Sequence, residues 1–196
     1  MKHIKTLLLL LLCCFIILSC EKKENIDNEK ENTEVNSNVK LGDFVSGGYV
    51  FYIKPDKSGG LVFAPSDVTD NTVAWGCKGL QISGLSAEVG DGIKNTQTIV
   101  SSCSETNTAA KLCDLYASGG FSDWALPSEK ELGLIISVCY EANSIVKNEH
   151  KLNPNDYYWT STQVDNNTAI VNMGKGQLKT GKFRDDKHRV RAIRSF

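Results

Sequence analysis

The fold is decided by one stretch in the middle of the chain, Gly119-Gly120-Phe121-Ser122-Asp123-Trp124-Ala125-Leu126-Pro127-Ser128-Glu129-Lys130-Glu131-Leu132. Its paired glycines can adopt the positive-φ turn that ends a helix. Pro127 disfavours helical backbone in the residue before it, so the chain reaches Ser128 extended. Ser128 and Glu131 have the spacing of a capping box, which predicts that a second helix begins here. We expect a helix–loop–helix corner whose two aromatic residues anchor the loop to the core.

Both sides of this corner carry apolar residues at the spacing of an amphipathic helix. They are Ala109, Leu112, Cys113 and Tyr116 before the corner, and Leu132, Ile135, Ile136, Cys139 and Tyr140 after it. The first helix is expected to end at the paired glycines, and the second at about Asn143.

Runs of aromatic and β-branched residues predict strands on both sides of the two helices. They cover residues 44–53, 61–65, 157–162, 168–173, 178–183 and 189–196, and the first two form a hairpin. Residues 66–99 have no clear period and are expected to be irregular. Strands, then helices, then strands is the order of an α+β fold. The length of 196 residues predicts a single main domain.

The front of the chain carries an export pattern. Two lysines precede an apolar run over residues 7–18, which is typical of a secretory signal peptide and short for a membrane span. Ile17-Leu18-Ser19-Cys20 resembles a bacterial lipobox, which implies a signal peptide over residues 1–19 and lipidation of Cys20. Glu21 is not the aspartate of an inner-membrane retention signal, so the outer membrane or the cell surface is favoured.

Residues 20–39 are rich in Glu, Asn and Lys, and we expect a disordered polar tether there. Its acidic cluster is either a solvated spacer or a surface-export signal. Residues 40–196 then form the folded domain.

Several segments together resemble one bacterial family. They include Gly47-Gly48-Tyr49-Val50-Phe51-Tyr52, Trp75-Gly76-Cys77, Gly120-Phe121-Ser122-Asp123-Trp124-Ala125-Leu126-Pro127-Ser128, Tyr158-Trp159-Thr160-Ser161-Thr162 and Arg189-Val190-Arg191-Ala192-Ile193-Arg194, with residues 60–67 and 109–113 between them. In this order they are similar to the Lcl C-terminal domain family, named for a collagen-like adhesin. The resemblance implies a C-type-lectin-like fold, similar also to sulfatase-modifying-factor domains, with small antiparallel sheets and paired first and last strands. The chain has no Gly-X-Y repeat before the domain, which puts a collagen-type trimer in doubt.

Four cysteines lie in the body of the chain, where export would permit disulfides. We expect Cys77 and Cys103 to pair, because they bracket most of the irregular segment and a staple stabilises such a loop. Cys113 and Cys139 either pair or remain buried thiols on helix faces. Spacing alone does not choose among the three possible connectivities.

Positive charge gathers near the C-terminus, although the chain as a whole has a net charge of −1. The candidate anion-binding residues are Lys182, Arg184, Lys187, Arg189 and Arg191. Two of the arginines alternate with Val190 and Ala192, so they share one strand face. That face either grips an anionic polysaccharide or is a charged, solvated edge whose arginines pair with nearby aspartates.

Motifs for chemistry are absent from the sequence. No CxxC or Cys/His cluster indicates zinc, Gly90-Asp91-Gly92 is weak evidence for calcium, and no cofactor is expected. No spacing suggests a catalytic triad, and aromatic residues do not interleave with the basic ones as nucleic-acid binding would require. The sequence therefore predicts a non-enzymatic, lipid-anchored binding protein of the cell envelope. The alternatives are a structural or assembly protein that contacts another envelope protein and, less favoured, an enzyme.

Overall fold

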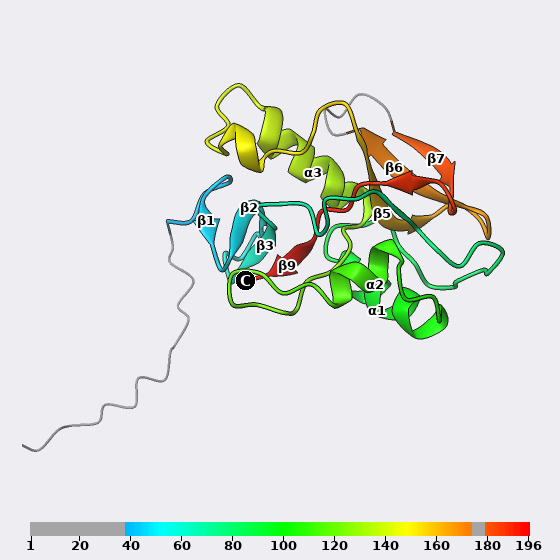
Figure 1. Ribbon diagram of the computed structural model, residues 1–196. Helices are drawn as coiled ribbons and strands as arrows, with labels where there is room; N and C mark the ends of the chain where they lie inside the picture. Colours follow the sequence, from blue (N-terminus) through cyan, green and yellow to red (C-terminus); the bar gives the residue numbers. More distant parts are fainter. Residues whose placement is uncertain (1–37, 174–178) are drawn as a thin grey trace, which may run out of the picture. The chain divides into compact units, whose positions relative to one another are not determined.

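The computed structural model of the chain describes residues 38–173 and 179–196. The predicted signal peptide, Cys20 and the tether up to residue 37 lie outside the described residues. None of the helices in the described part has the length and hydrophobicity needed to cross a bilayer. The described residues form an α+β fold with small antiparallel sheets and few helices, which confirms the predicted class at that level (Figure 1).

The corner at residues 119–132 forms as its sequence predicts. The backbone N–H of Ser128 donates to Glu131 Oε2 at 2.6 Å, and Ser128 Oγ accepts from the Glu131 N–H at 3.3 Å. This capping box begins helix α3, Glu129–Tyr140. Glu131 is fully buried, and desolvation raises the pKa of its carboxyl group. A Cβ on Gly92 would lie 2.2 Å from Glu131 Oε2, so the close approach requires glycine there.

The first predicted helix is shorter than expected. Helix α2 covers Ala109–Asp114 and ends before the paired glycines. Gly119 and Gly120 instead take positive φ values of 62° and 85° in a turn closed between Ser118 and Phe121. A Cβ on Gly119 would lie 2.9 Å from the Gly47 Cα. The glycine therefore serves a close backbone approach rather than a helix end.

The opening hairpin joins the C-terminal strand in one sheet. The strands are β1 (Phe44–Val45), β2 (Gly48–Ile53), β3 (Gly60–Phe63) and β9 (Ile193–Ser195), and their order is β1-β2-β3-β9. The closing strand thus pairs with β3, and the expectation that the first and last strands pair is wrong. The reason is that β1 folds back on the free edge of β2, which leaves β3 as the edge open to β9.

Two further sheets complete the β-structure. Strands β5 (Tyr157–Gln163), β6 (Thr168–Met173) and β7 (Lys179–Phe183) form an antiparallel sheet in that order. Strand β4 (Val73–Ala74) pairs with β8 (Lys187–His188). Of the closing strand predicted over residues 189–196, only Ile193–Ser195 forms, as β9; Arg189 makes an isolated bridge with Tyr158, and residues 190–192 are not in a strand.

Helix α1, Gly92–Ser102, begins inside the segment predicted to be irregular and continues three residues past its end. Its buried positions include Asn95 and Thr96, which give the helix a polar inner face. Asn95 Nδ2 donates to Ser86 O at 2.6 Å and to Ser161 Oγ at 2.9 Å. Because these buried groups are polar, the helix lacks the apolar period on which the sequence prediction depends. A short 3₁₀ turn, Asn148–His150, follows α3.

The predicted disulfide between Cys77 and Cys103 is present in the structure. It fastens the loop after β4 to the residue that ends α1. The other two described cysteines, Cys113 and Cys139, are buried and unpaired, which is the second of the two alternatives. Burial raises the pKa of both thiols, so they pack as small apolar side chains.

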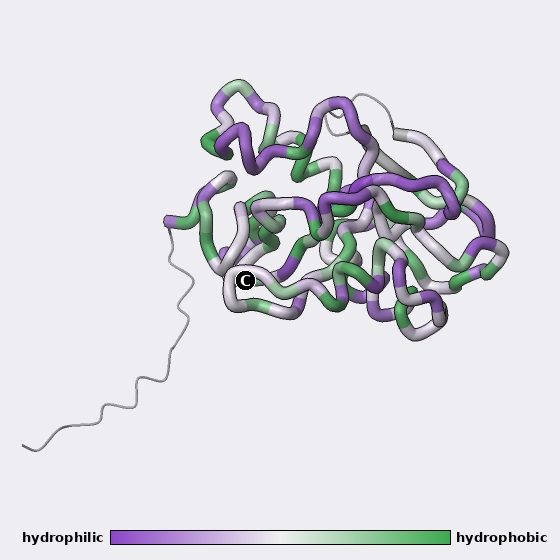
Figure 2. The backbone as a smooth tube through the Cα atoms, in the orientation of Figure 1, coloured by the Kyte–Doolittle hydropathy of each residue, from purple (hydrophilic) through white to green (hydrophobic). Residues whose placement is uncertain are grey.

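Tryptophan side chains tie the sheets to the rest of the core. Trp75 Nε1 donates to Thr160 O, and Trp159 Nε1 donates to Val73 O, each at 2.8 Å. Both indole rings are fully buried. In Figure 2 the hydrophobic colour runs along β2, β3 and α3, whereas the stretch leading from β7 towards β9 is hydrophilic.

The corner at residues 119–132 is held to β9 by a bidentate ion pair between Asp123 and Arg194. Arg194 Nε and Nη2 donate to Asp123 Oδ1 and Oδ2 at 2.6 and 3.0 Å, and the guanidinium lies 3.8 Å from the centroid of the Phe121 ring. Nη1 donates to Ser46 O at 2.9 Å. Hydrogen bonding to Arg194 lowers the pKa of Asp123.

Replacing Asp123 tests this contact. The folded pKa lies below the ordinary value of 3.8, so the stabilisation is present above that pH and is lost as the pH falls through the folded pKa. Asp123→Asn should lower the free energy of unfolding at pH 7 by at most about 1 kcal/mol, because solvent screens the half-exposed carboxylate. Urea titrations across pH should show the difference from wild type shrinking below pH 3.8. Asp70→Asn, at an exposed position, is the control, and a pH-independent difference at Asp123 would contradict the contact.

Candidate functional site

The predicted anion-binding residues are not gathered on one surface. Arg191 is almost completely buried, and its Nε donates to Asp67 Oδ1 at 2.8 Å. Its Nη1 donates to the backbone oxygens of Ala64 and His150 at 3.0 and 2.8 Å. The charge and the donors of this guanidinium are therefore directed into the fold.

Arg189 shares the same carboxylate. Its Nη1 donates to Asp67 Oδ2 at 3.1 Å, and its Nε donates to Asp156. The hydrogen bond to Asp156 is the main reason that the pKa of Arg189 is raised. Arg189 and Arg191 do share a face, as the alternation predicts, and Asp67 lies against that face. We name the three residues Asp67, Arg189 and Arg191 the arginine clamp.

A tyrosine completes the surroundings of the clamp. Tyr158 is fully buried, and its hydroxyl donates to Asp67 Oδ2 at 3.3 Å while it accepts from the Asn153 N–H at 2.8 Å. Burial, reinforced by the charge of Asp67, raises the pKa of Tyr158. The tyrosine thus stays a neutral donor that braces the carboxylate of Asp67.

Arg184 is enclosed separately. Its side chain is fully buried, and the guanidinium lies 4.3 Å from the centroid of the Trp75 ring. The two terminal nitrogens donate to the backbone oxygens of Cys77, Leu80 and Asp165 and to the Gln163 side chain. Burial lowers the pKa of Arg184. This cage joins the disulfide-bonded loop to the turn after β5, so Arg184 does not face a ligand.

The two lysines of the candidate set lie nearer to solvent. Lys182 is half-buried, with Nζ 5.2 Å from the centroid of the Tyr157 ring. Lys187 is exposed in β8 and lines a pocket of about 400 Å³.

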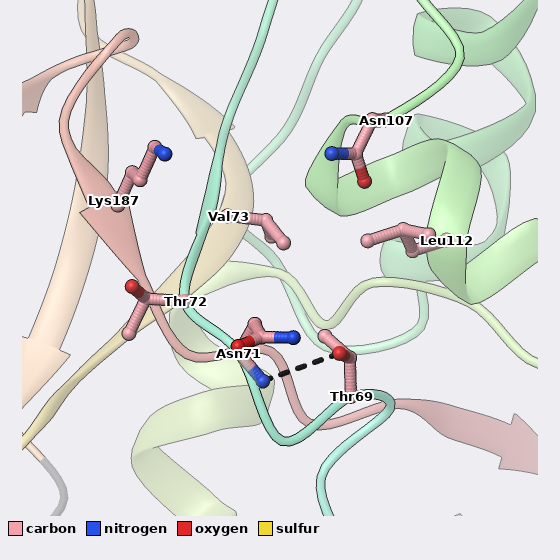
Figure 3. A pocket seen from close by; sticks show the side chains of 7 residues that line it. All are labelled: Thr69, Asn71, Thr72, Val73, Asn107, Leu112 and Lys187. Atoms are coloured by element: carbon pink, nitrogen blue, oxygen red, sulfur yellow. Dashed lines mark hydrogen bonds between the residues drawn. The ribbon is translucent and has the colours of Figure 1, made fainter.

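This pocket is the best candidate for a binding site (Figure 3). One wall is the loop before β4, with Thr69, Asn71 and Thr72, and the other is the start of α2, with Asn107. Val73 and Leu112 face each other across it. The Asn71 N–H donates to Thr69 Oγ1 at 3.2 Å, which shapes the loop. We call the seven residues that line it, the six just named and Lys187, the threonine–asparagine pocket.

The walls of the pocket are joined by backbone contacts. Ala74, at the end of β4, forms a bridge with Thr108, the N-cap of α2, and pairs with Lys187 in β8. The Thr108 side chain accepts from the Lys111 N–H, which fixes the start of the helix. The pocket is therefore preorganised by three elements that are far apart in the sequence.

Most of the pocket was missed from the sequence, which singled out Lys187 alone. Thr69, Asn71, Thr72 and Asn107 occur in short polar runs that are indistinguishable from ordinary loops. The hydroxyl and amide side chains around the buried Val73 were the available sequence signal for a pocket. They form a pocket only because α2 lies opposite the loop before β4 in the folded domain. Among the described residues, Cys77, Cys103 and Glu105 are the one group close enough to share a metal ion, and both sulfurs are in the disulfide.

The arginine clamp makes a stability prediction. Asp67→Asn should lower the free energy of unfolding by about 3 kcal/mol, because two largely buried guanidiniums lose their shared carboxylate. Asp185→Asn removes an exposed pair with Lys78 and should leave the unfolding midpoint unchanged within error. Equal effects of the two substitutions in chemical denaturation would show that the clamp is not a brace.

Comparisons with known proteins identify the family. No curated protein sequence matches the chain. One similar solved structure is a fimbrial protein from Bacteroides ovatus ATCC 8483, with 12% sequence identity and a TM-score of 0.47; the match covers 68% of this chain and 35% of that one, so the chain spans about a third of its length. The family model of the Lcl C-terminal domain matches residues 59–194, which is most of the sequence. The chain therefore belongs to the Lcl C-terminal domain family.

Proposed function

We propose that this protein is a lipid-anchored, extracytoplasmic binding protein whose lectin-like domain holds an acidic sugar in the threonine–asparagine pocket. The observation that carries the proposal is the composition of that pocket. Its rim offers hydroxyl and amide groups, which can both donate to and accept from sugar hydroxyls. Val73 and Leu112 provide an apolar surface for the carbon face of a ring, and Lys187 provides one positive charge.

The pocket favours binding over catalysis. Lys187 is the one titratable side chain among the seven residues that line it. General acid–base chemistry uses titratable groups that converge on one reacting atom. A single exposed lysine instead suits a carboxylate or sulfate group on the ligand.

An extracytoplasmic location is supported by two features. The disulfide between Cys77 and Cys103 is of a kind that persists in oxidising compartments. The lipobox-like sequence before Cys20 supplies an anchor for the chain. Glu21 leads us to place the protein at the outer membrane or the cell surface.

The ligand proposal is tested by glycan binding. A glycan array with heparin-like and uronic-acid polymers should show binding that weakens as salt increases, and uncharged polymers should bind less. Lys187→Ala should weaken the acidic ligand about fivefold, which corresponds to about 1 kcal/mol for one exposed charge contact. Lys54→Ala, also at an exposed lysine, is the matched control. If no glycan binds, or if Lys187→Ala and Lys54→Ala weaken binding equally, the threonine–asparagine pocket is not the binding site.

The anchor is tested separately. The purified chain should begin at Cys20 and carry acyl chains by mass spectrometry, and it should pellet with membranes. Cys20→Ser should move it to the soluble fraction because the lipid contribution is lost. A wild-type chain without acyl mass would contradict the anchor and leave the pocket proposal standing.

A second candidate function is assembly with another envelope protein. Leu80, Val164 and Phe183 are exposed large apolar residues. They come from neighbouring segments, because the Gly79 N–H donates to Asn166 O at 2.6 Å and Lys78 Nζ lies 5.2 Å from the Phe183 ring centroid. An exposed apolar cluster of this kind can form the centre of a larger protein interface.

A further inference from the structure

A second exposed apolar cluster lies where the described chain begins. Leu41, Phe44 and Ile145 are 49%, 56% and 62% exposed. A Cβ on Gly42 would lie 2.7 Å from Ile145 Cγ1, so Ile145 packs directly on the backbone between the other two residues. We call these three side chains the entry patch.

The entry patch is held in place before any partner arrives. The Gly42 N–H donates to Val50 O at 2.8 Å, and the Val50 N–H donates to Asp43 O at 2.9 Å. Phe44 packs edge-on against Tyr49, with ring centroids 5.0 Å apart. These contacts fix the backbone that carries Leu41 and Phe44, which lowers the entropy cost of docking.

Charged residues surround the entry patch. Lys40 and Lys147 are both exposed, and each lies one or two residues from a member of the patch. Asp43 accepts the Lys40 N–H at 2.8 Å, so its carboxylate is partly used within the turn. Glu149 is also near, because its charge adds to burial in raising the pKa of Tyr49, which packs against Phe44. Lysines beside exposed apolar side chains are typical of surfaces that contact a membrane interface.

The position of the patch along the chain argues for the bilayer as its occupant. Seventeen residues, Glu21 to Ser37, separate the proposed lipid-bearing Cys20 from Asn38, the first described residue, and they can span at most about 60 Å. The entry patch begins three residues later, so an anchored domain keeps it near the membrane surface. A weak contact then suffices, because tethering makes the docking step intramolecular.

Other occupants fit less well. The tether itself is rich in Glu, Asn and Lys, with Ile26 and Val35 as its aliphatic residues before Asn38. A second copy would need far more than three side chains, since a stable protein interface buries about 20–30 residues on each side.

We propose that the entry patch docks onto the bilayer and thereby orients the domain on its membrane. This inference rests on the proposed lipid anchor. Docking through Leu41, Phe44 and Ile145 would fix which face of the domain is turned away from the lipid.

A depth measurement tests the proposal on the full lipid-bearing chain. The three native tryptophans are buried, so an added tryptophan reports its own surroundings. The Phe44→Trp protein should emit at a shorter wavelength in vesicles of phosphatidylethanolamine and phosphatidylglycerol than it does without vesicles. Brominated phospholipid should reduce the fluorescence of the added tryptophan at least about twofold. Phe183→Trp is the matched control, because Phe183 is also 56% exposed. Its emission should be unaffected.

Further variants separate the possible outcomes. Leu41→Ser with Ile145→Ser in the Phe44→Trp background should restore most of the lost fluorescence, and a thermal melt checks that the domain remains folded. No quenching at position 44 on a chain that carries acyl mass overturns docking and leaves the anchor standing. Equal quenching at positions 44 and 183 overturns the patch as the docking face. A chain without acyl mass overturns the anchor and this inference with it.

Discussion

One carboxylate, that of Asp67, joins the opening and closing parts of the domain. It follows β3, and it receives Arg189 and Arg191 from the segment between β8 and β9. Arg191 also donates to the backbone beyond α3, so three distant regions meet around one carboxylate and two guanidiniums. Removing one partner of such a largely buried pair leaves an uncompensated charge, which is why the arrangement constrains the fold strongly.

The contacts of the arginine clamp change how the basic C-terminal segment is interpreted. Arg184, Arg189 and Arg191 are used for internal contacts, and Arg194 pairs with Asp123. Most of the arginine charge is therefore compensated inside the described fold, and the surface charge that remains for a ligand is on lysines. Lys187 is a candidate ligand contact because of its neighbours in the threonine–asparagine pocket, and not because positive charge is dense around it.

The parts of the fold that sequence predicts well are those with a local cause. The capping box at Ser128 depends on residues three positions apart, and every buried residue of α3 after Glu131 is apolar. Helix α1 was missed because Asn95 and Thr96 occupy its buried face and find partners in remote segments. The partner of Arg191 is 124 residues away, and no spacing rule connects them. Likewise, β9 pairs with β3 and not with the first strand because β1 covers the other edge of the hairpin. A strand of two residues such as β1 is hard to predict from sequence.

The same distinction applies to the candidate site. Lys187 could be singled out by its charge, whereas Thr69, Asn71 and Asn107 become a site only when β4 and α2 are joined through Ala74 and Thr108. Ala74 also pairs with Lys187 of the closing segment, so the pocket depends on that segment as well. The proposed pocket is thus formed by tertiary contacts that no local spacing in the sequence predicts.

A double-mutant cycle between Asp67 and Arg191 tests the central claim most directly. Asp67→Asn, Arg191→Met and the double variant would be compared with wild type by equilibrium urea denaturation. If the clamp joins the two ends of the domain, the double variant should be more stable than the sum of the single effects predicts, by about 2 kcal/mol. Effects that add to within about 0.5 kcal/mol would show that the two residues act independently and would contradict the account.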